Sequence, residues 1–321
     1  MKKVKERIIV TGGAGFIGSN LCRELLRRKK DVEIIVLDNY FSGSKENLTD
    51  LIRDKRLRII EGDIRELKIL REVIKDADSV YHLAVACLGL SFENPEIVHE
   101  INDVGSFNLC TAAKSARKLR RLVYVSSSEV YGSAVYTPID ENHPLNPTTP
   151  YGASKAAGEM YVKAFHYTFN VPSIIVRPFN TYGPYQREDS YAGVVTKFFQ
   201  RVSKGLPPII FGNGAQTRDF TYISDTVNGI ILASDCEELI CDTVNIASGT
   251  ETSINKLARS IIALFDKTEN LEPIHVSPRP GDVRKHLASI KKAKKFLDYR
   301  PRVPLEEGLK LYKQWLMKKT K

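Results

Sequence analysis

The sequence has few cysteines and no long apolar run. Its five cysteines are scattered and odd in number, and no CxxC pair or Cys/His cluster has metal-ligand spacing, so neither a disulfide framework nor a metal site is expected. No apolar run approaches the roughly 18 residues that span a bilayer. Gly12 and Gly13 interrupt the apolar stretch that follows the basic start of the chain, which argues against a secretory signal. We therefore expect a cytoplasmic protein with reduced thiols and no membrane partner.

Positive charge is in excess, with a formal net charge of +10. Such a balance is one sign of nucleic-acid binding. Here the excess is spread along the chain or lies near its end, in residues 291–295 and at Lys318 and Lys319. Runs of this kind are typical of solvated helix faces or frayed ends, so we expect no nucleic-acid partner.

Short apolar segments alternate with helical patterns in the first half of the 321 residues. Candidate helices cover residues 17–29, 66–74, 95–118 and 151–169. Candidate strands cover residues 7–11, 33–38, 57–62, 79–83, 122–126 and 173–177. Buried strands alternating with helices predict an α/β, Rossmann-type, doubly wound parallel sheet.

After Pro178 the pattern changes. Glycine and proline cluster at residues 183–184, 205–208, 212–214 and 278–281, which predicts short elements joined by loops. We expect a Rossmann domain over residues 1–178 and a smaller C-terminal α/β lobe over residues 179–321 that binds substrate. Two segments, near residues 221–234 and 243–247, are expected to return to the sheet.

A glycine triplet, Gly12, Gly15 and Gly18, follows the first predicted strand and opens the first predicted helix. Glycine permits a tight turn and lets backbone N–H groups approach a pyrophosphate, which the helix N-terminus also favours. Asp38 ends the second predicted strand, where a carboxylate can accept hydrogen bonds from ribose hydroxyls and repel a 2′-phosphate. Because no arginine stands at position 39 or 40, the pattern predicts NAD rather than NADP.

Tyr151 and Lys155 are four residues apart in a predicted helix, so they share one face of it. An ammonium beside the phenol, together with a positive nicotinamide ring, would favour the phenolate, which could accept a hydroxyl proton while hydride leaves the same carbon. A Ser-rich strand end lies about 25 residues upstream, where a serine could hydrogen-bond the substrate oxygen. Alone, a Tyr-x-x-x-Lys pair is usually structural; after a dinucleotide loop it predicts a catalytic pair.

These motifs together resemble the extended short-chain dehydrogenase/reductase family, specifically its NAD-dependent nucleotide-sugar epimerases, dehydratases and decarboxylases, and most closely the UDP-glucose 4-epimerases. The similarity runs over nearly the whole chain. It is carried by the segments TGGAGFIGSNL, LDNYFSG, EGDIRE, VYHLA, INDVGSFNL, VSSSEVYG, YGASKAAGE, VRPFNTYGP, GAQTRDFTYISD and RPGDVRKHLASIKKAKKFLDYRP.

The resemblance implies roles for individual residues. Catalytic residues would be Ser127, Tyr151, Lys155 and Glu129. The substrate, a UDP-sugar, would contact Ser127, Asn180, Phe211, Arg218, Arg279, Asp282 and His286. Besides Tyr151 and Lys155, the cofactor NAD would be bound by Gly12, Gly15, Phe16, Ile17, Gly18, Asp38, Asn39, Tyr40, Phe41, Ser42, Gly43, Asp63, Ile64, Leu83, Ala84, Val85, Asn102 and Phe179.

The resemblance leaves the reaction open. The family's dehydratases usually carry an Asp-Glu pair after the catalytic Ser/Thr, where this chain has Ser128 and Glu129. Loss of the Asp favours a 4-epimerase that works through a 4-keto sugar. Retention of Glu129 keeps a UDP-glucuronate decarboxylase or a 4,6-dehydratase as alternatives.

Three further expectations come from the same comparison. His286 stands where related epimerases admit or exclude an N-acetyl group, and an imidazole favours glucose/galactose; the alternative is a strand residue facing solvent. Family members commonly dimerise through two helices per subunit, here residues 95–118 and 151–169, so a homodimer is expected. A non-catalytic NAD-binding regulator is the remaining alternative to an enzyme, because a fold does not fix a function.

Overall fold

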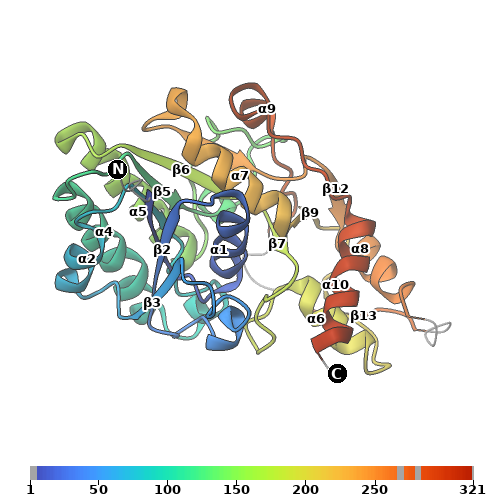
Figure 1. Cartoon of the computed structure of the whole chain (residues 1–321). Helices are drawn as coiled ribbons and strands as arrows, with labels where there is room; N and C mark the ends of the chain where they lie inside the picture. The colour runs from blue at the N-terminus through green and yellow to red at the C-terminus, as the bar shows by residue number, and fades with distance from the viewer. Residues whose placement is uncertain (1–5, 266–270, 279–282, 320–321) are drawn as a thin grey trace.

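A parallel sheet of seven strands forms the centre of the computed structural model, which describes residues 6–265, 271–278 and 283–319 (Figure 1). The strand order is β11-β6-β5-β4-β1-β2-β3, and every neighbouring pair is parallel. This is the doubly wound order, with the switch point between β1 and β4. The strands are β1 (Glu6–Thr11), β2 (Val32–Asp38), β3 (Leu57–Glu61), β4 (Ser79–His82), β5 (Arg121–Val125), β6 (Ser173–Pro178) and β11 (Thr243–Ile246).

The sequence of these strands explains their position. All five residues of β5 and all six of β6 are buried, as expected where helices cover both faces of a parallel sheet. Burial of Val, Ile and Leu side chains on both faces supplies most of the favourable free energy that holds the layers together. The predicted Rossmann-type α/β fold is confirmed.

Helices cover the two faces of the sheet. On one face α1 (Phe16–Arg28) lies beside α7 (Ile223–Asp235), and on the other α2 (Leu67–Ile74), α4 (Gly105–Lys114) and α5 (Pro150–Phe169) lie side by side (Figure 1). The helix α9 (Lys291–Leu297) packs against α7 and β11. Of the segments near residues 221–234 and 243–247, the first is mostly the helix α7, which lies over the sheet, and the second contains β11, the edge strand.

Shorter elements build the C-terminal lobe. Three two-stranded sheets pair β7 with β10, β8 with β13 and β9 with β12. The strands are β7 (Thr181–Tyr182), β8 (Ile209–Phe211), β9 (Thr217–Asp219), β10 (Thr221–Tyr222), β12 (Glu251–Ser253) and β13 (Ile274–Val276), and the helices are α6 (Val194–Val202), α8 (Ile254–Ile262) and α10 (Leu305–Lys319).

The helix predicted over residues 95–118 is continuous from Pro95 to Lys114 but changes type along its length, and it ends earlier than predicted. It consists of α3 (Pro95–His99), a π-helical turn η3 (Glu100–Val104) and α4. The wide turn places Asn102 against the backbone of Ala86, to which its amide makes two hydrogen bonds. Local pairing of this kind cannot be read from helical periodicity. The remaining turns are the 3₁₀ helices η1 (Lys45–Leu48), η2 (Gly89–Phe92), η4 (Ser128–Tyr131) and η5 (Glu237–Leu239).

None of the helices in the described part of the chain is both long enough and apolar enough to cross a bilayer.

Candidate active site

A cavity of about 1560 Å³ opens at the carboxyl ends of the central strands. Its walls come from the segments that follow β1 to β6, from β8 and β9 of the C-terminal lobe, and from α10. Ligands bind at this edge of open α/β sheets because the strand order reverses there and leaves a crevice. The cavity is large enough for a dinucleotide and a second ligand together.

The glycine loop forms one end of the cavity, between β1 and α1. Gly12 has a φ of +69°, and a Cβ added to it would lie 2.5 Å from the backbone nitrogen of Ala84. A Cβ on Gly18 would lie 2.2 Å from the carbonyl oxygen of Gly12. Only glycine fits these two positions, and their close packing presents the N-terminus of α1 to the cavity. Such an arrangement suits a pyrophosphate.

Asp38 stands at the end of β2 on the wall of the same cavity. Its carboxylate accepts hydrogen bonds from the backbone nitrogens of Ala14 and Tyr40, both at 2.8 Å. Burial raises the pKa of Asp38 above its ordinary value, and the two backbone bonds oppose that shift. The side chain is thus fixed where ribose hydroxyls of a nucleotide on the glycine loop would lie.

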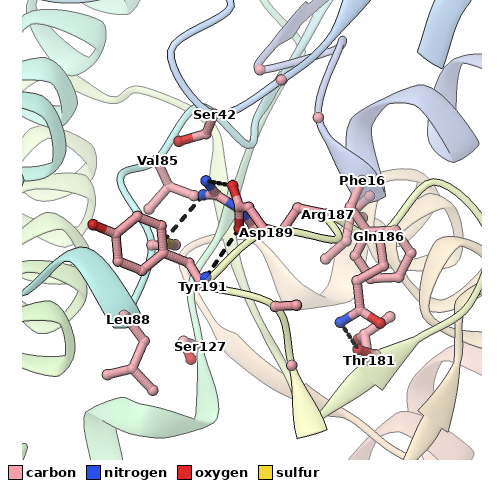
Figure 2. Close-up of a pocket in the computed structure, with 18 of the residues that line it drawn as sticks. Phe16, Ser42, Val85, Leu88, Ser127, Thr181, Gln186, Arg187, Asp189 and Tyr191 are labelled. Atoms are coloured by element: carbon pink, nitrogen blue, oxygen red, sulfur yellow. Dashed lines mark hydrogen bonds and ion pairs between the residues drawn. The ribbon is translucent and has the colours of Figure 1, made fainter. Parts of the chain in front are cut away.

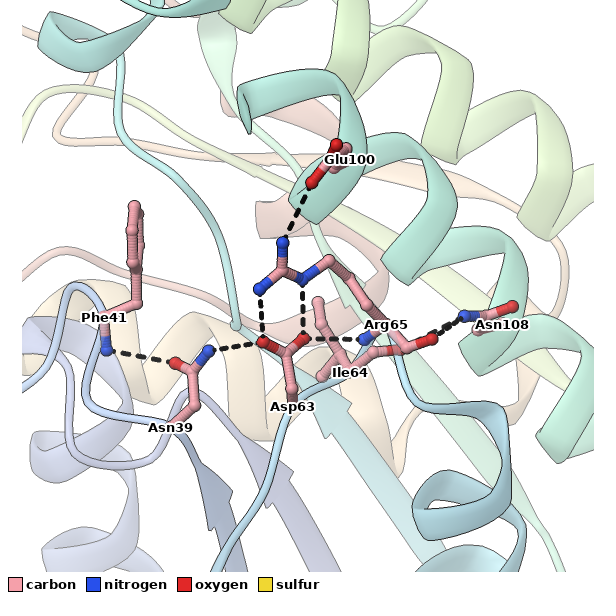
Figure 3. Close-up of polar contacts among 7 residues, drawn as sticks. All are labelled: Asn39, Phe41, Asp63, Ile64, Arg65, Glu100 and Asn108. Atoms are coloured by element: carbon pink, nitrogen blue, oxygen red, sulfur yellow. Dashed lines mark hydrogen bonds and ion pairs between the residues drawn. The ribbon is translucent and has the colours of Figure 1, made fainter. Parts of the chain in front are cut away.

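A polar cluster continues the wall beyond Asp38 (Figure 3). The amide of Asn39 donates to Asp63 at 2.8 Å, and Arg65 binds the same carboxylate through two nitrogens. Arg65 also reaches Glu100 at 2.9 Å. Hydrogen bonds from Arg65 are the main reason that the pKa of Asp63 lies below its ordinary value. The cluster holds Asp63 and Ile64 in the cavity wall.

Tyr151 and Lys155 lie in the first turns of α5. Thr149 caps this helix by accepting a hydrogen bond from the backbone nitrogen of Gly152 at 3.0 Å, and Pro150 occupies the first helical position. Both features favour helix initiation at this point. Tyr151 and Lys155 both line the cavity, as does Ser127, which directly follows Ser126 at the end of β5.

Burial raises the pKa of Tyr151 to about 12, and the Ser127 hydroxyl on the same wall acts against that shift. The expectation that the Lys155 ammonium and the nicotinamide ring together favour the phenolate stays a prediction; among the protein's own groups, desolvation of the phenolate is the largest influence. A lower pKa requires an additional positive charge in the cavity.

Lys155 is 3% exposed, and its ammonium lies 4.3 Å from the centre of the Tyr124 ring. Burial lowers the pKa of Lys155 to about 7, while the charges of Glu159 and Asp103 act in the opposite direction. An ammonium over an aromatic face gains a cation–π interaction, which offsets part of the desolvation. The side chain is thereby held against the cavity wall.

Ser127 also begins the turn η4. Its hydroxyl accepts a hydrogen bond from the backbone nitrogen of Glu129 at 3.2 Å. Ser128 and Glu129 line the cavity with it, and the charge of Glu129 contributes to the raised pKa of Tyr151. The structure thus brings the four residues predicted to be catalytic to one wall.

Three of the predicted substrate contacts line the cavity from the C-terminal lobe. They are Asn180, Phe211 and Arg218. The guanidinium of Arg218 donates to the carbonyl oxygens of Thr217 and Val283, at 2.9 and 2.6 Å. A guanidinium held in this way suits a diphosphate. Arg279 and Asp282 lie outside the described residues.

Sequence reasoning missed several residues of the wall. Arg187 pairs with Asp189 beside Tyr191 (Figure 2) and donates to the Sγ of Cys87 at 3.3 Å. Tyr191 also bonds Glu93, another residue of the wall. The Gly183-Pro184 pair predicted a loop in this part of the chain, but it did not predict which residues the loop contacts.

Another missed group comes from α10. Trp315, Lys318 and Lys319 line the cavity, and the Lys319 ammonium lies 2.6 Å from Glu188. Lys318 and Lys319 are exposed on the last turn of α10, as expected for a solvated helix face, and this face also borders the cavity.

Four predicted contacts do not line the cavity: Tyr40, Asn102, Phe179 and His286. His286 is 1% exposed, lies 3.3 Å from the carbonyl oxygen of Ser128 and packs against the ring of Phe179. Burial lowers its pKa to about 4. His286 is thus neither a residue of the cavity wall nor a solvent-facing residue. If it influences which sugar is admitted, it does so through its contacts with Ser128 and Phe179.

Nothing in the described ranges suggests a metal centre: they contain no group of three or more His, Cys, Asp or Glu side chains that could hold a metal ion.

Comparisons with known proteins agree with this geometry. The family model for GDP-mannose 4,6 dehydratase matches residues 9–312. A putative UDP-glucose 4-epimerase of Methanocaldococcus jannaschii is 36% identical, over 96% of this chain and 98% of that protein. A UDP-glucuronic acid decarboxylase of Arabidopsis thaliana is 33% identical, over 96% of this chain and 88% of that protein.

A solved structure carries the cofactor. The dTDP-glucose 4,6-dehydratase of Streptomyces venezuelae, crystallised with NAD bound, superposes with a TM-score of 0.89 at 30% identity and covers 97% of each chain. The glycine loop and Asp38 of the present chain fit that cofactor. The chain therefore belongs to the extended short-chain dehydrogenases/reductases, in their NAD-dependent family of nucleotide-sugar epimerases and dehydratases.

Proposed function

We propose that the chain is an NAD-dependent UDP-sugar 4-epimerase that inverts C4 through a 4-keto intermediate, with UDP-glucose and UDP-galactose as its substrates. The observation that carries the proposal is the convergence of Ser127, Tyr151 and Lys155 on one cavity wall, with Ser128 in place of a catalytic acid. The relative from Methanocaldococcus jannaschii, named a putative UDP-glucose 4-epimerase, supports the choice of sugar.

The chain's own residues supply the proton chemistry. NAD, when bound, supplies a hydride acceptor and a positive nicotinamide ring beside the phenol. Tyr151 takes the proton of the sugar C4 hydroxyl, and Ser127 hydrogen-bonds the same oxygen and steadies its position. Lys155 anchors the nicotinamide ribose. After the keto sugar turns over, Tyr151 returns a proton to the oxygen on the other face.

The other end of the nucleotide sugar lies in the C-terminal lobe. Arg218 is placed to bind the diphosphate, because a guanidinium can form two parallel hydrogen bonds to phosphate oxygens. Asn180 and Phe211 lie beside it in the wall. By family resemblance Arg279 and Asp282 complete this contact. Binding energy from this end holds the hexose against Tyr151.

A decarboxylase acting on UDP-glucuronate is the second candidate, and one observation favours it. Glu129 lines the cavity and its charge reaches Tyr151, where an acid or base could act on the carbon next to a keto group. Decarboxylases from Arabidopsis thaliana are 33% identical to the chain. A 4,6-dehydratase would use the same position. A non-catalytic regulator would not need an intact Ser127/Tyr151/Lys155 set.

A panel of substrates tests the proposal. The protein is incubated with UDP-glucose, UDP-GlcNAc, UDP-glucuronate and dTDP-glucose, and products are identified by mass spectrometry and NMR. The proposal predicts an isomer of unchanged mass from UDP-glucose. Loss of CO₂ from UDP-glucuronate would instead establish the decarboxylase, and loss of water the dehydratase.

We also propose a homodimer formed through α4 and α5. These helices expose large apolar side chains: Phe107 on α4 is 45% exposed, and Met160 and Tyr167 on α5 are 46% and 77% exposed. Exposed apolar clusters of this kind favour a protein interface. Sedimentation should give twice the chain mass of 36.1 kDa; a strict monomer would remove this proposal.

A further inference from the structure

A fully buried ion pair lies behind the candidate catalytic wall. Glu159 is on α5 and Arg177 is on β6, and their side chains are 0% and 2% exposed. The guanidinium binds the carboxylate through two nitrogens, one of them at 2.8 Å. Burying two ions costs desolvation energy that their attraction barely offsets. Stability alone therefore does not account for the pair.

The pair is the centre of a wider set of hydrogen bonds. Ser126 donates to Glu159 at 2.5 Å, Arg177 donates to the hydroxyl of Tyr131 at 2.7 Å, and that hydroxyl donates to Asn245 at 2.7 Å. All five residues belong to different segments: α5, β6, the end of β5, η4 and β11. The set therefore fixes α5 relative to the strand ends beside it.

Two members of this set adjoin catalytic residues. Ser126 directly precedes Ser127, so the bond from Ser126 to Glu159 fixes the backbone that carries the Ser127 hydroxyl. Glu159 stands four residues after Lys155, one turn along the same helix face. A single carboxylate thus touches the serine strand end and places a negative charge near the lysine.

We infer that Glu159 is a positioning residue of the catalytic site, which holds Ser127 in register with α5 through Ser126 and stands one helical turn from Lys155 on the same face of α5. This inference deepens the proposed function and rests on it for the roles of Ser127 and Lys155.

Charges around Lys155 come from several elements. Burial lowers its pKa to about 7, and the charge of Glu159 is the largest influence that raises it, ahead of Asp103 on η3. On the sheet side lie His82 of β4 and the ring of Tyr124 of β5; burial keeps His82 neutral, with a pKa of about 3. Glu159 is therefore the main anion that opposes the desolvation of Lys155.

Arg177 complicates a test of Glu159, because its guanidinium is paired with that carboxylate. Glu159→Gln removes the anion and leaves the guanidinium unpaired. The double variant Glu159→Gln with Arg177→Met removes both charges, and it keeps the inference testable should the single variant fail to fold. Both variants take away the charge next to Lys155.

The experiment measures the pH dependence of kcat for the NAD-loaded protein. In Glu159→Gln and in the double variant the alkaline limb, where Lys155 loses its proton, should move to lower pH by about one unit. Ser126→Ala keeps the charge but loses the bond to Glu159, so kcat should fall several-fold with an unshifted limb. Asp225→Asn is the matched control: it removes a buried carboxylate of α7, on the opposite face of the sheet, and should leave the profile unchanged.

A second readout separates this inference from the proposed function. The pH dependence of urea unfolding reports the ionisation of Lys155 even if no nucleotide sugar is turned over. The free energy of unfolding should begin to rise at a lower pH in the Glu159 variants than in the unaltered protein. A folded Glu159 variant with full NAD content, an unshifted kcat profile and an unshifted unfolding profile would overturn the inference.

Discussion

Ser127 and Tyr151 line the same cavity, although they follow a strand end and lie in the first turn of a helix, respectively. The Ser127 hydroxyl also acts to lower the pKa of the Tyr151 phenol, so the two side chains interact at the wall. One oxygen of a bound sugar can therefore contact both residues, one as base and the other as hydrogen-bond partner. This pairing is the geometric core of the proposed reaction.

Tyr151→Phe should lower kcat by roughly 10²–10⁴-fold, the usual contribution of a positioned acid or base. NAD content should stay unchanged, because the glycine loop, Asp38 and Lys155 are untouched. Turnover and bound NAD are measured on the same preparation. Tyr136→Phe serves as the control, since Tyr136 bonds Asp140 on an exposed loop outside the cavity wall. Near-normal turnover in Tyr151→Phe would refute the assigned base.

Lys155→Met should change how stability depends on pH. Burial lowers the pKa of Lys155 to about 7 in the folded protein, whereas an unfolded lysine titrates near 10.4. Between these values the unfolded chain binds the extra proton, so the free energy of unfolding from this group rises with pH from about 7 to 10. Below pH 7 that contribution is absent.

Urea unfolding of protein free of nucleotide, at steps from pH 6 to 9.5, measures this effect. The unaltered protein should gain stability relative to Lys155→Met across that window. Parallel curves for the two proteins would mean that Lys155 keeps an ordinary pKa.

Asp38→Ala should weaken NAD binding by about 10- to 100-fold, the effect of losing hydrogen bonds to a charged group. NADP binding should weaken less, because the carboxylate no longer repels the 2′-phosphate. The preference for NAD over NADP should therefore become smaller. Titration of both cofactors measures the ratio. Asp54→Ala, in the segment between β2 and β3 where Asp54 pairs with Arg56 outside the cavity wall, is the control. An unchanged ratio in Asp38→Ala would separate Asp38 from cofactor choice.

Gly12→Ala should destabilise the fold by about 1–3 kcal/mol and release NAD, because the new Cβ would lie 2.5 Å from backbone at Ala84. Gly205→Ala is a matched control: it has a similar φ of +71° with nothing within 4 Å of an added Cβ. Gly205→Ala should lower the free energy of unfolding only by the backbone strain, about 1 kcal/mol. Thermal unfolding and NAD content distinguish the two. Equal effects would show that close packing at Ala84 is unimportant.

Local patterns were sufficient to predict the sheet and the glycine loop. Each of the strands β1 to β6 contains Val or Ile in a short apolar run, and Gly12 and Asp38 stand at strand ends, where position along the chain fixes position in space. The same holds for Tyr151 and Lys155, because helical spacing alone puts them on one face.

Other features of the site depend on tertiary packing. Nothing near Trp315 or Lys318 signals a ligand, and only the path of α10 brings them to the cavity. The sequence predicted that His286 contacts the substrate. In the fold, the segment that carries His286 packs against η4, so the imidazole is buried behind Ser128. The raised pKa of Tyr151 likewise reflects desolvation, which depends on the whole wall and not on the lysine four residues away.

The fate of the C4 hydrogen tests the central claim most directly. UDP-glucose deuterated at C4 is incubated with the protein, and the product is examined by mass spectrometry and NMR. The proposed reaction returns the same hydride to the opposite face, so UDP-galactose should form with deuterium still at C4 and with no change in mass. Loss of water, or no UDP-galactose at all, would contradict the account.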